Sequence, residues 1–216
     1  MWSIVDIFVK GGIAMYPIAL CSVLLVAFCI EKVIYLRRVR IDVDNLMARI
    51  RASIEAGKVM EAIAICEANP TPMANLMRAA LKKADTADRA LIREAIEDAA
   101  SLEMPRIERF IPEMATIGSV TPLLGLLGTI FGMIRAFNVI AVQGTGDPHA
   151  MAGGISEALI STAAGLIVAI PAVALYRYFQ QRVNSFITDM ESRSSEVLDL
   201  VSSKDISKKK AKWDEI

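Results

Sequence analysis

Aromatic residues are scarce in this 216-residue chain: they make up 6% of it, whereas hydrophobic residues make up 54%. An excess of charge is also missing, because 24 basic residues balance 24 acidic ones, so nothing predicts a nucleic-acid partner. The three cysteines form no CxxC pair, and we expect neither a disulfide framework nor a zinc site. A glycine-rich phosphate loop, a metal-ligand cluster and a nucleophile–base motif are missing too. We therefore expect a non-enzymatic protein without a metal or cofactor.

Long charge-free runs are what the chain does have. Gly11–Ile30, Met114–Ile134 and Ala158–Tyr176 contain no charged residue. A helix of about 20 apolar residues is long enough to cross a bilayer. A soluble core could accommodate one such helix, but three in a short chain favour a membrane protein. The predicted fold is therefore all-α and polytopic, with three transmembrane helices and long helices extending into the cytoplasm.

The placement of basic residues predicts the orientation, because Lys and Arg are retained on the cytoplasmic side. Basic residues are frequent after the first run and in the tail, including SKKKAK at 207–212, whereas Arg135 is the one basic residue close to the second connection. The arginines that follow the first run also argue against a cleaved signal peptide. We expect the N-terminus outside, and these segments: transmembrane helices at 11–36, 113–136 and 155–177, a cytoplasmic helical region at 37–112, a periplasmic loop at 137–154, and a cytoplasmic C-terminal helix with a basic tail at 178–216.

Local patterns add detail outside the spans. Residues 1–10 mix apolar and polar side chains and predict either an amphipathic helix at the membrane surface or an ordered turn. In the cytoplasmic region, Gly57 suits a helix end, 69–72 (NPTP) suits a turn, and 85–88 suits a helix cap. A long helix is expected to run from Ala87 into the second span, bent but not ended by its prolines, Pro105, Pro112 and Pro122.

Polar residues inside the spans are the first functional candidates. Thr129 lies about five residues, or roughly 7 Å, from the outer end of the second span, and Thr162 lies about seven residues, or roughly 10 Å, from that of the third. The two hydroxyls are thus expected at similar depth, with Glu157 near the outer mouth. Each threonine could instead simply bond a main-chain carbonyl, and Glu157 could be an interface residue.

Small residues surround these polar groups. Gly125, Gly128 and Gly132 lie in the second span, and Gly165 lies in the third. Small side chains let membrane helices approach closely. We expect these glycines to pack helices, either those of one subunit or those around an inserted helix.

The motifs TPLLGLLGTIFGMIRAF (121–137) and GGISEALISTAAGLIVAIPAVALY (153–176) resemble the ExbB/TolQ/MotA family of proton-channel subunits, most closely ExbB and then TolQ. The resemblance implies a homopentamer in the bacterial inner membrane around a dimer of an ExbD- or TolR-like protein, which has one span with a membrane Asp. It implies that Thr129 and Thr162 line the pore, that Glu157 matches the family glutamate and belongs with them to the proton pathway, and that the complex energises a TonB- or TolA-like protein.

Several alternatives remain open. The motifs do not distinguish a TolQ-like role in envelope constriction from an ExbB-like role in outer-membrane transport. A non-conducting membrane scaffold would need only the helices and would tolerate changes at Thr129 and Thr162. A solute transporter is disfavoured because no inverted repeat is visible and three spans are few.

Overall fold

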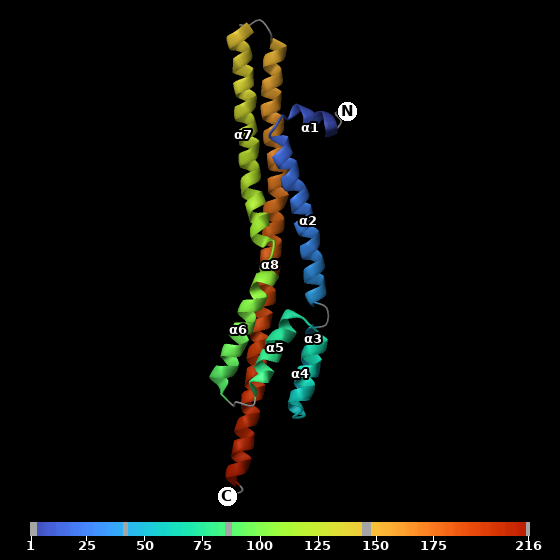
Figure 1. The fold of residues 1–216 in the computed structure, drawn as a ribbon, viewed down its shortest axis with the longest axis vertical. Coiled ribbons are helices and arrows are strands. Elements are labelled where there is room, and N and C mark those ends of the chain that lie inside the picture. Colours follow the sequence, from blue (N-terminus) through green and yellow to red (C-terminus); the bar gives the residue numbers. More distant parts are fainter. Residues whose placement is uncertain (1–3, 41–42, 85–87, 144–147, 215–216) are drawn as a thin grey trace. The chain divides into compact units, whose positions relative to one another are not determined.

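The computed structural model describes residues 4–40, 43–84, 88–143 and 148–214, and within these ranges the chain is helical with no strand. Three stretches are long and apolar enough to cross a membrane, which confirms the predicted all-α polytopic fold. The helices are α1 (Ile4–Lys10), α2 (Met15–Arg40), α3 (Val43–Glu55), α4 (Val59–Ala68), α5 (Pro72–Lys82), α6 (Arg89–Glu108), α7 (Ile111–Gln143) and α8 (Pro148–Asp214) (Figure 1).

The helices form two compact units. The first, which we call the membrane unit, comprises Met1–Val33 and Phe110–Gln180, and the second, the helical unit, comprises Ile34–Arg109 and Gln181–Ile216. Helices α2 and α8 contribute residues to both units.

In the membrane unit, α7 and the first part of α8 run antiparallel and side by side (Figure 1). Large apolar side chains on both helices point outward and are more than half exposed. Water would make such a surface costly, whereas lipid tails or a neighbouring apolar helix would not. The exposed residues include Leu123 and Phe137 on α7 and Leu159, Ile167 and Ile170 on α8.

The helical unit is built like a soluble protein, with α3 to α6 and the end of α8 around an apolar core. Its centre is closed to solvent and contains Ile50, Met73, Met77 and Val183, each no more than 1% exposed. Ion pairs on its surface join α8 to α3 and α6. They are Arg51–Glu196 at 2.8 Å, Arg193–Asp44 at 2.5 Å and Arg89–Asp199 at 2.6 Å. Because exposed pairs add little stability, the apolar core holds this unit together.

Helix boundaries in the helical unit confirm the turn residues read from the sequence. Gly57 follows α3 with φ 78°, a conformation that favours glycine. Thr71 caps α5 by accepting a hydrogen bond from the Ala74 amide at 3.2 Å, and Pro72 follows at the first helical position. Asp88 caps α6 by accepting one from the Ala90 amide at 2.9 Å, while residues 85–87 of the predicted cap lie outside the described residues.

The expectation of one continuous helix from Ala87 into the second span is wrong. Helix α6 ends at Glu108 and α7 begins at Ile111. Between them, Phe110 has φ 65°, and its ring stacks on that of Phe28 at 4.7 Å with an interplanar angle of 11°. The left-handed backbone breaks the helix, and Pro112 then falls in the first turn of α7, where proline is tolerated. Pro105 and Pro122, by contrast, lie inside helices that continue past them.

Helices α7 and α8 also extend into the segment 137–154, which was expected as a loop. Helix α7 continues to Gln143, and α8 begins at Pro148. The physical reason is that the turn-forming residues are confined to GTGDP at 144–148, with proline well suited to the first helical position. The basic cluster at 207–212 follows the helical backbone of α8, and its side chains lie outside the described residues.

The strain at Phe110 leads to a first prediction. Replacing Phe110 with Ala or with Gly removes the same ring stack, but only Gly adopts φ 65° without strain. We therefore expect F110G to be more stable than F110A by about 1 kcal/mol, the usual cost of a left-handed residue with a Cβ. SDS-titration unfolding in detergent micelles measures this difference. A more stable F110A, as at an ordinary position, would contradict the assigned backbone.

Burial of Cys66 leads to a second prediction. This α4 residue is 2% exposed, and burial raises the pKa of its thiol from 9.0 to about 11. The thiolate is the reactive form, so at pH 8 its population falls about 100-fold. In a C21S/C29S variant, iodoacetamide should label folded Cys66 at least about 100-fold more slowly than the SDS-unfolded chain, with the rate rising toward pH 11. Equal rates in the folded and unfolded protein would refute this burial.

Candidate functional site

The closest approach between two helices in the membrane unit lies along a glycine stripe on α7 and α8. A Cβ placed on Gly125 would lie 3.1 Å from the Ser161 carbonyl oxygen, and one on Gly165 would lie 2.9 Å from the Thr121 carbonyl oxygen. One on Gly132 would lie 2.6 Å from a carbonyl oxygen of α8. These neighbours are backbone atoms, which cannot rotate away, so no larger residue fits without separating the helices.

The stripe is longer than the sequence predicted. It includes Gly128, whose Cβ would meet the Ser161 side chain, and also Gly118 and Gly154, which the sequence reading did not assign. A Cβ on Gly118 would lie 2.8 Å from the Val173 side chain, and one on Gly154 would lie 2.7 Å from the Gly132 carbonyl oxygen. In the sequence, the adjacent glycines at 153–154 are the feature that could have indicated close packing at Gly154.

The two candidate hydroxyls each donate to a carbonyl of α7. Thr162 Oγ1 donates across the interface to the Gly125 oxygen at 3.3 Å. Thr129 Oγ1 donates to the Leu126 oxygen of its own helix at 2.6 Å. Both threonines are half-buried. Since a hydroxyl oxygen also has two lone pairs, each side chain can still accept a hydrogen bond from water or a partner.

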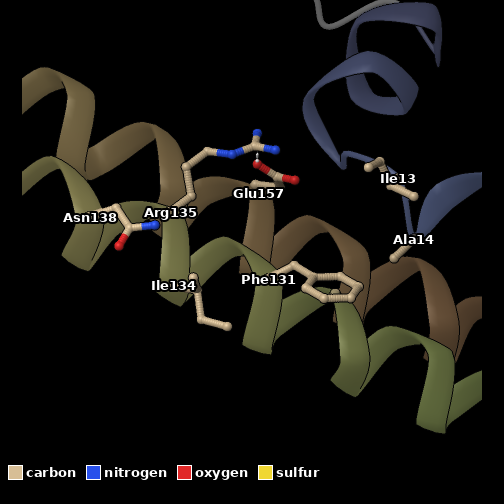
Figure 2. Close-up of a pocket in the computed structure, with 8 residues that line it drawn as sticks. Ile13, Ala14, Phe131, Ile134, Arg135, Asn138 and Glu157 are labelled. Carbon is tan, nitrogen blue, oxygen red and sulfur yellow. Dashed lines mark hydrogen bonds and ion pairs between the residues drawn. The ribbon is translucent and has the colours of Figure 1, made fainter.

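Glu157 is buried and paired. Its side chain is 9% exposed, and its Oε2 accepts a hydrogen bond from Arg135 Nη1 at 2.5 Å, as Figure 2 shows. Arg135 belongs to α7 and Glu157 to α8, so the ion pair bridges the two helices. The arginine side chain is 61% exposed, which leaves the rest of its guanidinium open to the surroundings.

The threonines and the ion pair lie on opposite sides of the α7–α8 pair. Successive residues of an α-helix point about 100° apart, so Glu157 and Thr162, five positions apart, point about 140° apart. Arg135 and Thr129, six positions apart, point about 120° apart. On each helix the glycine stripe lies between the two directions. Because the charged side chains meet on one side, both hydroxyls fall on the other, which we call the hydroxyl side.

The turn between α1 and α2 lies against the ion pair. A Cβ on Gly12 would collide with the Glu157 carboxylate, and Gly12 also has φ 71°, so the turn requires glycine at this position for two reasons. A cavity of about 280 Å³ lies beside the pair. Figure 2 shows Phe131 and Arg135 of α7 and Ile13 of the turn at its wall.

Sequence reasoning placed Glu157 near the outer mouth but did not identify its partner. Arg135 was noticed only as a basic residue on the unexpected side of the membrane. The sequence does contain a signal for this pair, because Arg135 and Glu157 have opposite charges at comparable depth on two antiparallel neighbouring helices. Such a pairing neutralises a carboxylate near lipid.

The hydroxyl side carries no charged residue along the two spans. From Met114 to Ile134 and from Ala158 to Tyr176 the chain has no Asp, Glu, Lys or Arg. Hydroxyls can order water and pass hydrogen bonds along without a fixed charge at membrane depth.

Comparison with known proteins gives a consistent result. The family model described as the MotA/TolQ/ExbB proton channel family matches residues 68–192, which is more than half of the chain. A biopolymer transport ExbB homologue from Methanothermobacter thermautotrophicus is 32% identical over 190 residues, covering 88% of this chain and 67% of the relative. ExbB from Pseudomonas putida is 30% identical over 213 residues, covering 94% of this chain and 62% of the relative. The Tol-Pal protein TolQ from Pseudomonas aeruginosa is 40% identical over 96 residues, covering 44% and 42% respectively.

The glycine stripe leads to a third prediction, for which neighbouring residues provide the control. A Cβ on Gly154 would lie 2.7 Å and 2.9 Å from backbone atoms of α7, whereas one on Gly153 would meet nothing within 4 Å. We expect G154A to lower the free energy of unfolding by about 1–3 kcal/mol through overpacking. G153A should leave it unchanged or raise it by up to about 1 kcal/mol, because Ala favours helix over Gly. SDS titration compares both variants, and equal stabilities would show that the helices do not meet here.

Proposed function

The chain belongs to the MotA/TolQ/ExbB proton channel family, and on this basis we propose that it is the ring-forming subunit of a proton-driven membrane motor. In this proposal five copies surround a dimer of an ExbD-like protein, and proton flow along the hydroxyl side drives movement between ring and dimer. The complex passes that work to a TonB-like protein for transport across the outer membrane.

The observation that carries the proposal is the composition of the hydroxyl side. Thr129 and Thr162 carry hydroxyls on this side at membrane depth, and exposed apolar residues surround them, among them Leu126 on α7 and Leu159 and Leu166 on α8. A single copy leaves this side uncovered. A ring of copies with an inserted partner helix would cover it and would place both hydroxyls beside that helix.

The energetics fit a motor powered by several protons. One elementary charge crossing 100 mV releases about 2.3 kcal/mol, so a few protons supply enough energy for a conformational step. Because this chain has no acidic residue from Met114 to Ile134 or from Ala158 to Tyr176, and Glu157 lies on the opposite side of the helix pair, the partner's membrane Asp would be the titrating group. The chain would then act as a stator that presents ordered water and hydroxyls to that Asp.

We place the protein in the bacterial inner membrane, with the N-terminus and the 137–154 segment in the periplasm and the helical unit in the cytoplasm. The distribution of Lys and Arg supports this orientation. A TolQ-like role is the second candidate, because TolQ relatives are as similar to part of this chain as ExbB relatives are. The two roles share the ring, the path and a single-span partner, and differ in whether the final protein is TonB-like or TolA-like.

A fourth prediction tests the path. The complex with a co-expressed ExbD-like single-span protein is reconstituted into proteoliposomes, and acidification of the lumen is followed with a pH-sensitive dye under an imposed potential. Thr162→Val removes the hydroxyl at nearly constant volume and should lower the proton flux at least tenfold, the size of effect expected for a lost proton-transfer group. Thr162→Ser keeps the hydroxyl and should retain most of the flux.

The matched control is Thr188→Val, which removes a hydroxyl that bonds a carbonyl of its own helix in the helical unit. Native mass spectrometry should give the same stoichiometry for all three variants. Flux in T162V equal to that of the unchanged protein would reject the path, and absence of flux in the unchanged complex would favour the scaffold alternative.

A further inference from the structure

We propose that Arg135 and Glu157 form a clamp that positions the α1–α2 turn on the membrane unit, and that neither side chain lies on the proton path. Arg135 is thereby assigned a positioning role, and Glu157 is moved from the path to the same role. The clamp itself depends on the geometry alone, whereas the exclusion from the path rests on the proposed function.

Three elements of the membrane unit meet at one carboxylate. Glu157 comes from α8, one of its oxygens bonds Arg135 of α7 at 2.5 Å, and the other lies where a side chain of residue 12 would be. Three separate segments of the membrane unit therefore depend on the position of this carboxylate. The Glu157 side chain is 9% exposed, so nearly all of its surface is in contact with protein.

The α1–α2 turn fits closely against the clamp. Gly12 provides space for the carboxylate because it has no side chain, and its φ of 71° reverses the chain between α1 and α2. The next residues continue the contact, since Ala14 is 6% exposed and its Cβ lies near Gly128. The turn is closed by hydrogen bonds from the Met15 amide to the Gly12 oxygen at 3.2 Å and from the Tyr16 amide to the Ile13 oxygen at 3.3 Å.

The clamp and the two threonines lie on different sides of the helix pair. Glu157 and Thr162 point about 140° apart on α8, with the glycine stripe between them. Thr162 bonds the Gly125 carbonyl, whereas Glu157 faces the turn and the cavity of about 280 Å³. A proton on Glu157 would have to cross the closely packed α7–α8 interface to reach either threonine.

Hydrogen exchange tests the clamp in the intact chain. Glu157→Gln keeps the shape of the side chain but leaves the Arg135 charge without its partner. We expect exchange at the Met15 and Tyr16 amides to rise about tenfold in Arg135→Met, because the buried Glu157 carboxylate then lacks its counter-charge, and in E157Q, because an amide bonds the exposed guanidinium less strongly than a carboxylate does. The double variant R135M/E157Q has neither charge and should return to within about threefold of the original rate. Arg135→Lys keeps the charge and should retain the protection.

The same variants test the exclusion from the path by proton flux in proteoliposomes with the ExbD-like partner. If the pair only positions the turn, E157Q should conduct poorly and the double variant should recover at least half of the original flux. A double variant that regains protection of the turn but conducts no better than T162V would identify Glu157 as a proton carrier and overturn the exclusion. Unchanged exchange in both single variants would overturn the clamp.

A matched control uses a second Arg–Glu pair of the chain. Arg93 and Glu97 form an exposed pair in the helical unit at 3.0 Å, and R93M/E97Q should change neither readout. Size-exclusion chromatography verifies that every variant remains folded and assembled. Absence of flux in the unchanged complex would count against the proposed function alone, because the exchange measurement needs no conduction.

Discussion

Close contact between the backbones of α7 and α8 is the constraint on which the rest of the membrane unit depends. Glycines on both helices leave no room for a Cβ, and at Gly132 and Gly165 the facing atoms are carbonyl oxygens of the other helix. In lipid the hydrophobic effect does not drive helices together, so packing at this distance and the hydrogen bonds it permits hold the pair. The Thr162 bond to the Gly125 carbonyl exists only because the helices approach so closely.

This contact also determines on which side of the α7–α8 pair the polar groups of the two spans lie. The interface is filled by glycine, alanine, serine and the fully buried Thr121, and the charged side chains of Arg135 and Glu157 lie on one flank. The flank with Arg135 and Glu157 is closed by the α1–α2 turn, and the flank with Thr129 and Thr162 is left uncovered in a single copy. The same packing arrangement therefore gives the helix pair two different sides. On one side an ion pair neutralises its charges and holds the turn, and the other side has no charge and is uncovered. The proposed motor subunit would need both, because a moving partner would require a rigid surface to move against.

The sequence predicted what depends on composition and local pattern. Long charge-free runs indicated the spans, and Gly57, Thr71 and Asp88 marked helix ends because their conformations and caps are local properties. It failed at Phe110, where a bulky residue adopts φ 65° while stacked on Phe28, since nothing in the local sequence indicates a left-handed phenylalanine. The Arg135–Glu157 pair was missed for a related reason: residues 22 positions apart become neighbours only when the register of two antiparallel helices is known.

The most direct measurement is a cryo-EM map of the complex with its single-span partner in lipid nanodiscs, read at the level of α7 and α8. The account predicts that Thr129 and Thr162 face the partner helix, while Arg135 and Glu157 face the α1–α2 turn on the opposite side. A map in which Glu157 faces the partner helix, or in which both threonines face lipid, would contradict it.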